Sequence, residues 1–70
     1  MAIPTWANNV KVGDWLAVKA EMFGRGGQNG IVIEPGPVDD GVALDFFTSH
    51  SQDEYISIEF YEWDELEPLA

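Results

Sequence analysis

His50 is the only histidine in this 70-residue chain, and it stands between two serines, Ser49 and Ser51. A nucleophile and its general base must lie within hydrogen-bond reach, whereas adjacent residues of an extended loop point apart. The sequence shows neither a third group to orient the histidine nor an oxyanion loop. We therefore expect that the protein is not an enzyme and that these serines form local turn hydrogen bonds.

The remaining ligand-type residues give little sign of a metal or cofactor. There is no cysteine, so a zinc site is not expected with a single histidine. The carboxylate pairs Asp39–Asp40 and Asp53–Glu54 lack the spacing of an EF-hand loop. The glycine-rich segment 24–30 carries no phosphate-binding pattern. We expect no cofactor and no dedicated metal site.

Charge is divided unevenly along the chain. Lys11, Lys19 and Arg25 are the only bases, and they balance the acids of residues 1–34. Residues 35–70 hold ten acids and no base, so the whole formal charge of −10 lies in the second half. A one-sided field costs stability through self-repulsion, which favours a role for these acids in binding. The same charge argues against direct binding to nucleic acid or to anionic membranes.

Length and composition indicate one small folded domain, residues 1–70. Hydrophobic residues make up 46% of the chain, which is enough for a core. No segment approaches the ~18 apolar residues of a membrane span. The N-terminal residues lack the basic and apolar regions of a signal peptide, and cysteine is absent. These features lead us to expect a cytoplasmic protein.

Apolar residues alternate along most of the chain, which predicts strands. In the last long strand the alternation places Ile58 and Phe60 inward, with Glu59 and Tyr61 outward. Trp15 also falls on an outward position. The predicted strands are 15–23, 31–34, 42–48 and 55–61, and residues 62–69 fit a short 3₁₀ turn and a last short strand. Asn29–Gly30 fits a turn between the first two strands, because both residues tolerate a positive φ.

Three short motifs resemble those of the SH3-like small β-barrels of bacteria and phages. They are Val12–Gly13–Asp14 before the first strand, Asn29–Gly30 before Val32, and the segment 64–69 with the sequence DELEPL. Related barrels include KOW- and Tudor-type domains and small subunits of photosynthetic redox complexes. The resemblance implies an all-β, five-stranded SH3-like barrel with a short 3₁₀ turn near the C-terminus. It also implies a non-catalytic adaptor or docking role.

The main functional hypothesis is an acidic protein–protein interaction module that docks on a basic surface of a partner protein. A narrower form is a nucleic-acid mimic that inhibits an enzyme, as a phage or plasmid product would. Charge would speed association, and aromatic anchors would lengthen the lifetime of the complex. The expected binding residues are Asp45, Glu59, Tyr61, Glu62, Trp63, Asp64 and Glu65.

The alternative hypothesis is an accessory structural subunit of a larger complex, such as a photosynthetic redox complex or a phage particle. Its apolar surface would then make the contact, and an exposed cluster of Trp6 with Trp15 would favour this alternative. The sequence leaves the partner and the oligomeric state open. It also leaves open whether Trp6, Trp15 and Trp63 belong to the core or to an interface.

Overall fold

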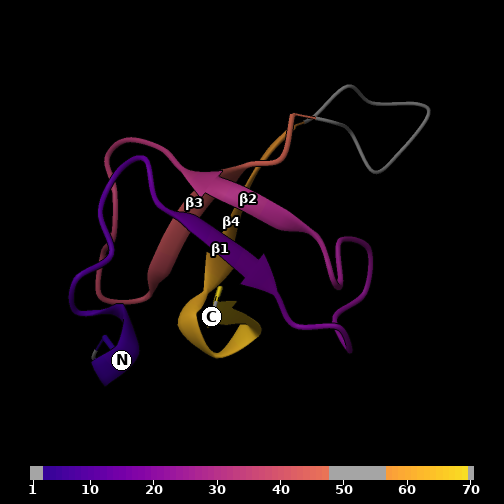
Figure 1. Cartoon of the computed structure of the whole chain (residues 1–70), viewed down its shortest axis with the longest axis horizontal. Coiled ribbons are helices and arrows are strands. Elements are labelled where there is room, and N and C mark those ends of the chain that lie inside the picture. Colours follow the sequence, from indigo (N-terminus) through magenta and orange to yellow (C-terminus); the bar gives the residue numbers. More distant parts are fainter. Residues whose placement is uncertain (1–2, 48–56, 70) are drawn as a thin grey trace.

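A computed structural model of the chain describes residues 3–47 and 57–69, and these form one antiparallel sheet (Figure 1). The elements are η1 (Thr5–Ala7), β1 (Trp15–Val18), β2 (Asn29–Val32), β3 (Gly41–Asp45), β4 (Ile58–Glu62), η2 (Trp63–Glu65) and β5 (Leu66–Pro68). The strand order is β4-β3-β2-β1-β5. The expected all-β class, the five strands and the 3₁₀ turn near the C-terminus are confirmed. Closure into a barrel is not seen in the described part of the chain, where the sheet is open.

One face of the sheet carries the core. In Figure 1, β1 and β2 cross in front of β3 and β4, so the curved sheet turns a single face inward. Each of the five strands contributes to this face, and η2 adds the largest buried side chain, Trp63. The buried core residues are Ala7, Leu16, Val18, Val32, Val42, Leu44, Phe46, Tyr61, Trp63 and Leu66. Burying each large side chain of this kind contributes about 1.5–3 kcal/mol, which is how so short a chain can fold.

The first strand is shorter than the alternation predicts. It ends at Val18, and the chain then turns, because the amide of Met22 donates to the carbonyl of Lys19 at 3.0 Å. The returning segment pairs with the strand end, where the amide of Gly27 donates to the carbonyl of Val18 at 2.9 Å. The predicted extension of this strand to residue 23 is wrong, and Ala20 is exposed in the loop.

Gly30 lies inside β2, so the predicted turn at Asn29–Gly30 is wrong. Glycine is needed at this position because a side chain would not fit there, and not because the backbone has a positive φ. A Cβ atom at Gly30 would lie 2.9 Å from the Cβ of Leu44 and 2.9 Å from Cε1 of Phe46. The missing side chain therefore leaves room for the Phe46 ring on the inner face of β2.

The phase of β4 is opposite to the prediction. Ile58 and Phe60 are 49% and 54% exposed, whereas Tyr61 is buried at 7%. The register explains this, because Glu59 and Tyr61 stand opposite Leu44 and Val42, which are both fully buried. The expected outward positions of Glu59 and Tyr61 are therefore wrong. The alternation of apolar residues predicted the wrong phase because polar residues face inward here. Glu59 forms an ion pair and Tyr61 forms an aromatic contact on the inner side of β4.

Candidate functional site

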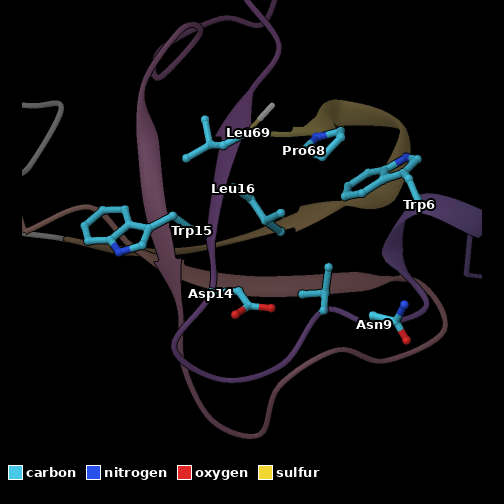
Figure 2. Close-up of a pocket in the computed structure, with 8 residues that line it drawn as sticks. Trp6, Asn9, Asp14, Trp15, Leu16, Pro68 and Leu69 are labelled. Atoms are coloured by element: carbon cyan, nitrogen blue, oxygen red, sulfur yellow. The ribbon is translucent and has the colours of Figure 1, made fainter.

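A groove of about 310 Å³ lies between Trp6 and Trp15 (Figure 2). It is built where the start of β1 meets the end of β5, and Leu16 lies between the two indole side chains. The residues that line it are Trp6, Asn9, Val10, Asp14, Trp15, Leu16, Pro68 and Leu69. Six of these residues are apolar, and Asn9 and Asp14 supply polar groups, a mixture that occurs in binding sites. Among the described residues that line it there is no serine, histidine, cysteine or lysine.

Aromatic contacts hold both tryptophans of this groove in place. The ring of Trp6 meets that of Trp63 edge-on, with centroids 5.7 Å apart and an interplanar angle of 86°. Trp15 contacts Phe47 with centroids 6.2 Å apart. Such pairs contribute about 0.5–1.5 kcal/mol beyond area burial. Trp6 is half-buried and Trp15 is 46% exposed, so both indoles keep surface for a ligand.

Asp14 is the only carboxylate in the groove, and Lys11 pairs with it. The Lys11 ammonium lies 3.3 Å from Oδ1 of Asp14, and the Lys11 amide donates to Oδ2 at 3.1 Å. The ammonium side chain is 78% exposed, so the pair is worth less than about 1 kcal/mol. Its effect is local neutralisation, which leaves the groove nearly uncharged.

A second groove of about 250 Å³ lies on the other side of Trp6. Its lining places Lys19 with two acids, Asp64 and Glu67, against an apolar wall of Trp63 and Leu66. Lys19 therefore lies within the acidic end of the chain, although it stands far from those acids in the sequence. The division of charge along the sequence is partly removed in space.

The acids expected to bind a partner do not share one face. The cross-strand pairing places Asp45 and Glu62 on the outer face of the sheet and Glu59 on the inner face. The side chains of Glu62 and Glu65 cap η2 reciprocally, and Oε1 of Glu65 accepts from the Glu62 amide at 2.9 Å. Asp64 is exposed in η2. Asp45, Glu62 and Asp64 thus remain on the surface, whereas Glu59 belongs to an internal network.

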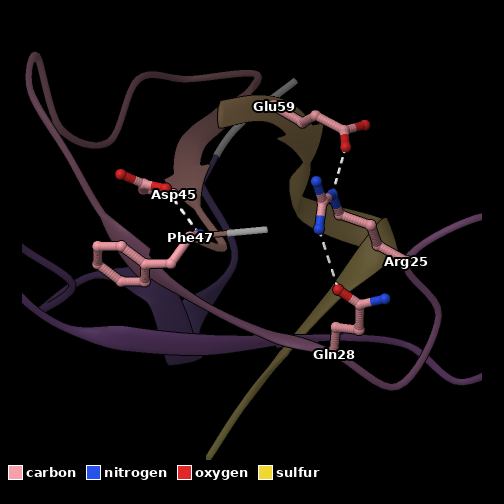
Figure 3. A network of polar contacts seen from close by, with 5 residues as sticks. All are labelled: Arg25, Gln28, Asp45, Phe47 and Glu59. Carbon is pink, nitrogen blue, oxygen red and sulfur yellow. Dashed lines mark hydrogen bonds and ion pairs between the residues drawn. The ribbon is translucent and has the colours of Figure 1, made fainter. Parts of the chain in front are cut away.

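That internal network is centred on Arg25, the one buried charged residue among those described (Figure 3). Its guanidinium Nε donates to Oε2 of Glu59, and Nη1 donates to Oε1 of Gln28 at 3.0 Å. The guanidinium carbon also lies 4.4 Å from the ring centroid of Phe46, a cation–π distance. The glycine-rich loop is therefore linked to β4 through the ion pair of Arg25 with Glu59.

Tyr61 and Trp63 were expected as aromatic anchors, and both are core residues. Tyr61 packs edge-on against Phe46, with centroids 5.9 Å apart. Burial raises the pKa of its hydroxyl above the usual 10.0, and the nearby charge of Glu59 raises it further. Trp63 is 2% exposed, and its indole Nε1 donates to the carbonyl of Val38 at 2.9 Å. Neither ring has the exposed area that an anchor needs.

The outer face of the sheet carries a group of apolar residues with exposed surface, of which the sequence predicted only Trp15 as outward. We call this surface the outer patch and define it by Trp15, Ile31, Ala43, Phe47, Ile58 and Phe60. Trp15, Ile31, Asp45 and Ile58 stand opposite one another across four strands, and Ala43 stands opposite Phe60 in the next row. The sequence does hold one sign of it, because Tyr61 places an aromatic residue on the face of β4 opposite to Ile58 and Phe60.

Phe47 joins the outer patch through an unusual backbone conformation. Its φ is +64°, a region that costs a residue other than glycine about 1–2 kcal/mol. Oδ1 of Asp45 accepts a hydrogen bond from the Phe47 amide at 2.8 Å and so helps to hold this conformation (Figure 3). The side chain remains 59% exposed beside Trp15.

Comparison with protein-family models, with curated proteins and with solved structures finds no match to this chain. Residues 3–47 and 57–69 contain no group of three or more metal-ligating side chains that could hold an ion. In the same residues no helix is long and apolar enough to cross a membrane. His50 and the pair Asp53–Glu54 lie outside the described residues.

Proposed function

We propose that this chain is a non-enzymatic interaction module that docks on a basic surface of a partner protein. The observation that carries the proposal is the location of the charges. The five described strands contain no Lys or Arg, and their acids are Asp45, Glu59, Glu62 and Glu67. Because Arg25 is buried, Lys11 and Lys19 are the only lysine or arginine side chains left at the surface. Arg25 is paired with Glu59, so the remaining surface keeps the excess of acids that the sequence shows.

The fold of this module is proposed to be SH3-like. Support comes from the five strands in a single sheet, from the pairing of the first strand with the last, and from the 3₁₀ turn between β4 and β5. These features match what the motif resemblance implies. A small sheet of this kind presents loops, grooves and an outer face to partners without a catalytic centre.

The test of charge-guided docking is kinetic. Partners are captured from lysate of the source cells, and association with the captured protein is then followed over a range of salt concentrations. Neutralising Glu62 and Asp64 together (Glu62→Gln with Asp64→Asn) should slow association by roughly three- to tenfold and flatten its salt dependence. The matched control neutralises Glu21 and Glu34, two exposed loop acids. Equal effects of the two pairs, or no salt dependence, would contradict the proposal.

The second candidate function is that of an accessory structural subunit, such as one in a photosynthetic redox complex or a phage particle. The observation that favours it is that Trp6 and Trp15 line one groove. In that case apolar contact would dominate, so Trp15→Ser should weaken assembly at every salt concentration. The charge pair above would then have little effect.

A nucleic-acid mimic of phage or plasmid origin is the narrower form of the main proposal. It requires several acids on one face, and Asp45, Glu62 and Asp64 are the surface acids available from the expected set. DNA or RNA should then displace the protein from its partner. A ternary complex would contradict mimicry and leave the docking proposal intact.

A further inference from the structure

β4 is an outermost strand of the sheet, so one of its two edges has no neighbouring strand among those described. The amide of Phe46 donates to the carbonyl of Ser57 at 2.8 Å, and the amide of Trp63 donates to the carbonyl of Asp40 at 3.3 Å. These two bonds flank β4 and set the alternation of its hydrogen bonds.

Antiparallel partners alternate between bonded and non-bonded pairs. Counting by twos from Ser57, the bonded positions of β4 are Glu59 and Tyr61. The backbone N–H and C=O groups of Ile58 and Phe60 therefore point away from β3, toward the free edge. The next such amide, that of Glu62, is already bonded to the Glu65 side chain, so the free stretch ends there.

The same two residues carry exposed apolar side chains. Ile58 and Phe60 are 49% and 54% exposed and belong to the outer patch. An added strand would thus bond to their backbone and could cover their side chains at the same time. Natural sheets protect such an edge with charged side chains, above all lysine, with proline or with a bulge. The sequence of β4, IEFYE, carries two glutamates but neither lysine nor proline, and its register with β3 runs without a bulge. Its charges are therefore all negative, so they repel an acidic strand and not a basic one.

The charges around this edge favour a basic strand as its binding partner. No base lies in any of the five strands, and Glu62 stands at the outer end of β4, on the same face as Ile58 and Phe60. An incoming strand with Lys or Arg beside its apolar residues would meet opposite charge. Acidic strands would meet like charge, which costs stability when the side chains lie across from one another.

A second copy of the chain fits the edge poorly. Each copy has a formal charge of −10, so self-association opposes itself. Four large side chains of the outer patch are about half exposed, which corresponds to roughly 400 Å² of apolar surface. A stable complex buries roughly 800 Å² on each partner. The apolar area of the outer patch is therefore too small to hold a second copy by itself. A basic strand would add backbone hydrogen bonds and ion pairs to this apolar contact.

We propose that the free edge of β4 binds an extended basic segment of a partner protein as an added strand. The segment alternates Lys or Arg with apolar residues, and its apolar side chains cover Ile58 and Phe60. This inference rests on the proposed docking on a basic partner and names the place and the form of that contact.

Three synthetic peptides test the inference against the whole chain. The first is a nine-residue peptide that alternates Lys with Val or Thr. The second has the same sequence with N-methyl groups on the residues whose amides would face β4. The third has Glu in place of Lys. Binding is followed by the amide signals of Ile58 and Phe60 in ¹H–¹⁵N spectra and by their hydrogen exchange.

The first peptide should bind, shift both signals and slow their exchange, and N-methylation should weaken it by about tenfold or more. Equal binding of the first two peptides would overturn strand addition and leave basic docking standing. Equal binding of the Lys and Glu peptides would overturn the proposed function itself. A concentration-dependent dimer formed through β4 would also overturn the inference, because a second copy would then occupy the edge.

A matched pair of variants locates the contact. Phe60→Lys places a charge at the edge, and Phe23→Lys places the same charge on a loop residue that is 89% exposed. Only Phe60→Lys should abolish binding of the first peptide, since both variants change the net charge equally. Retained dispersion of the ¹H–¹⁵N spectrum shows that each variant is folded. Equal losses in the two variants would mean that overall charge, not the edge, governs binding.

Discussion

The two faces of β4 reverse the usual relation between polarity and burial. The inner face holds a carboxylate, Glu59, and a phenol, Tyr61, whereas the outer face exposes Ile58 and Phe60. The inner face is stable because the guanidinium of Arg25 pairs with the carboxylate of Glu59 and also lies over the ring of Phe46. Nothing comparable among the described residues covers the outer side chains. The inner face is therefore complete within the chain, and the outer face is suited to contact with another molecule.

The largest effect should come from the apolar part of the inner face. Leu44 is fully buried and stands opposite Glu59. Leu44→Ala should lower the free energy of unfolding by about 3 kcal/mol, because it removes buried methyl groups and leaves a cavity. A chain of this length has a stability of about 4–10 kcal/mol, so urea denaturation should show a large shift of the midpoint. A loss similar to that of an exposed site would contradict the assigned inner face.

The next effect concerns the charge inside that face. Arg25→Met should cost about 2 kcal/mol, because it leaves Glu59 partly buried without its guanidinium. This is below the loss for a fully buried pair, since the Glu59 side chain keeps 24% exposure. The double variant Arg25→Met with Glu59→Leu should recover at least half of the loss in urea denaturation. If the double variant were less stable than Arg25→Met alone, the pair would not be the reason for the cost.

Sequence reasoning predicted the parts of the fold that depend on short-range pattern. The alternation over residues 42–48 predicted a strand there, and its apolar residues Val42, Leu44 and Phe46 are buried. The 3₁₀ turn before the last strand was also predicted correctly. These features depend on local alternation and on the proline and acids near the chain end. The all-β class with five strands follows from the same signals.

The candidate site could not be predicted, because it depends on contacts between distant segments. Arg25 lies 34 positions from Glu59, and that contact reverses the phase of β4. With the opposite phase, Tyr61 appeared to be an anchor and Phe60 appeared to be core. Apolar alternation favoured the wrong phase of β4, because the acid on its inward face is paired with a residue far away in the sequence.

A smaller effect should come from the turn that orients the outer patch. Asp45→Ala should cost about 1 kcal/mol, because it removes the acceptor that holds the Phe47 amide in its positive-φ conformation. Asp45→Asn keeps an acceptor oxygen and should cost less than half as much in urea denaturation. Equal losses for the two variants would show that the negative charge of Asp45, and not its hydrogen bond, stabilises the turn.

The smallest effect on stability should come from the centre of the outer face. Phe60→Thr should change the free energy of unfolding by no more than about 0.5 kcal/mol, since Phe60 is 54% exposed and threonine suits a strand. The variant should nevertheless bind a basic strand peptide more weakly, because it removes apolar surface at the edge. Urea denaturation and peptide titration of one preparation measure both properties. If Phe60→Thr lost as much stability as Leu44→Ala, both faces of β4 would be packed within the chain, and the contrast between a complete inner face and an available outer face would fail.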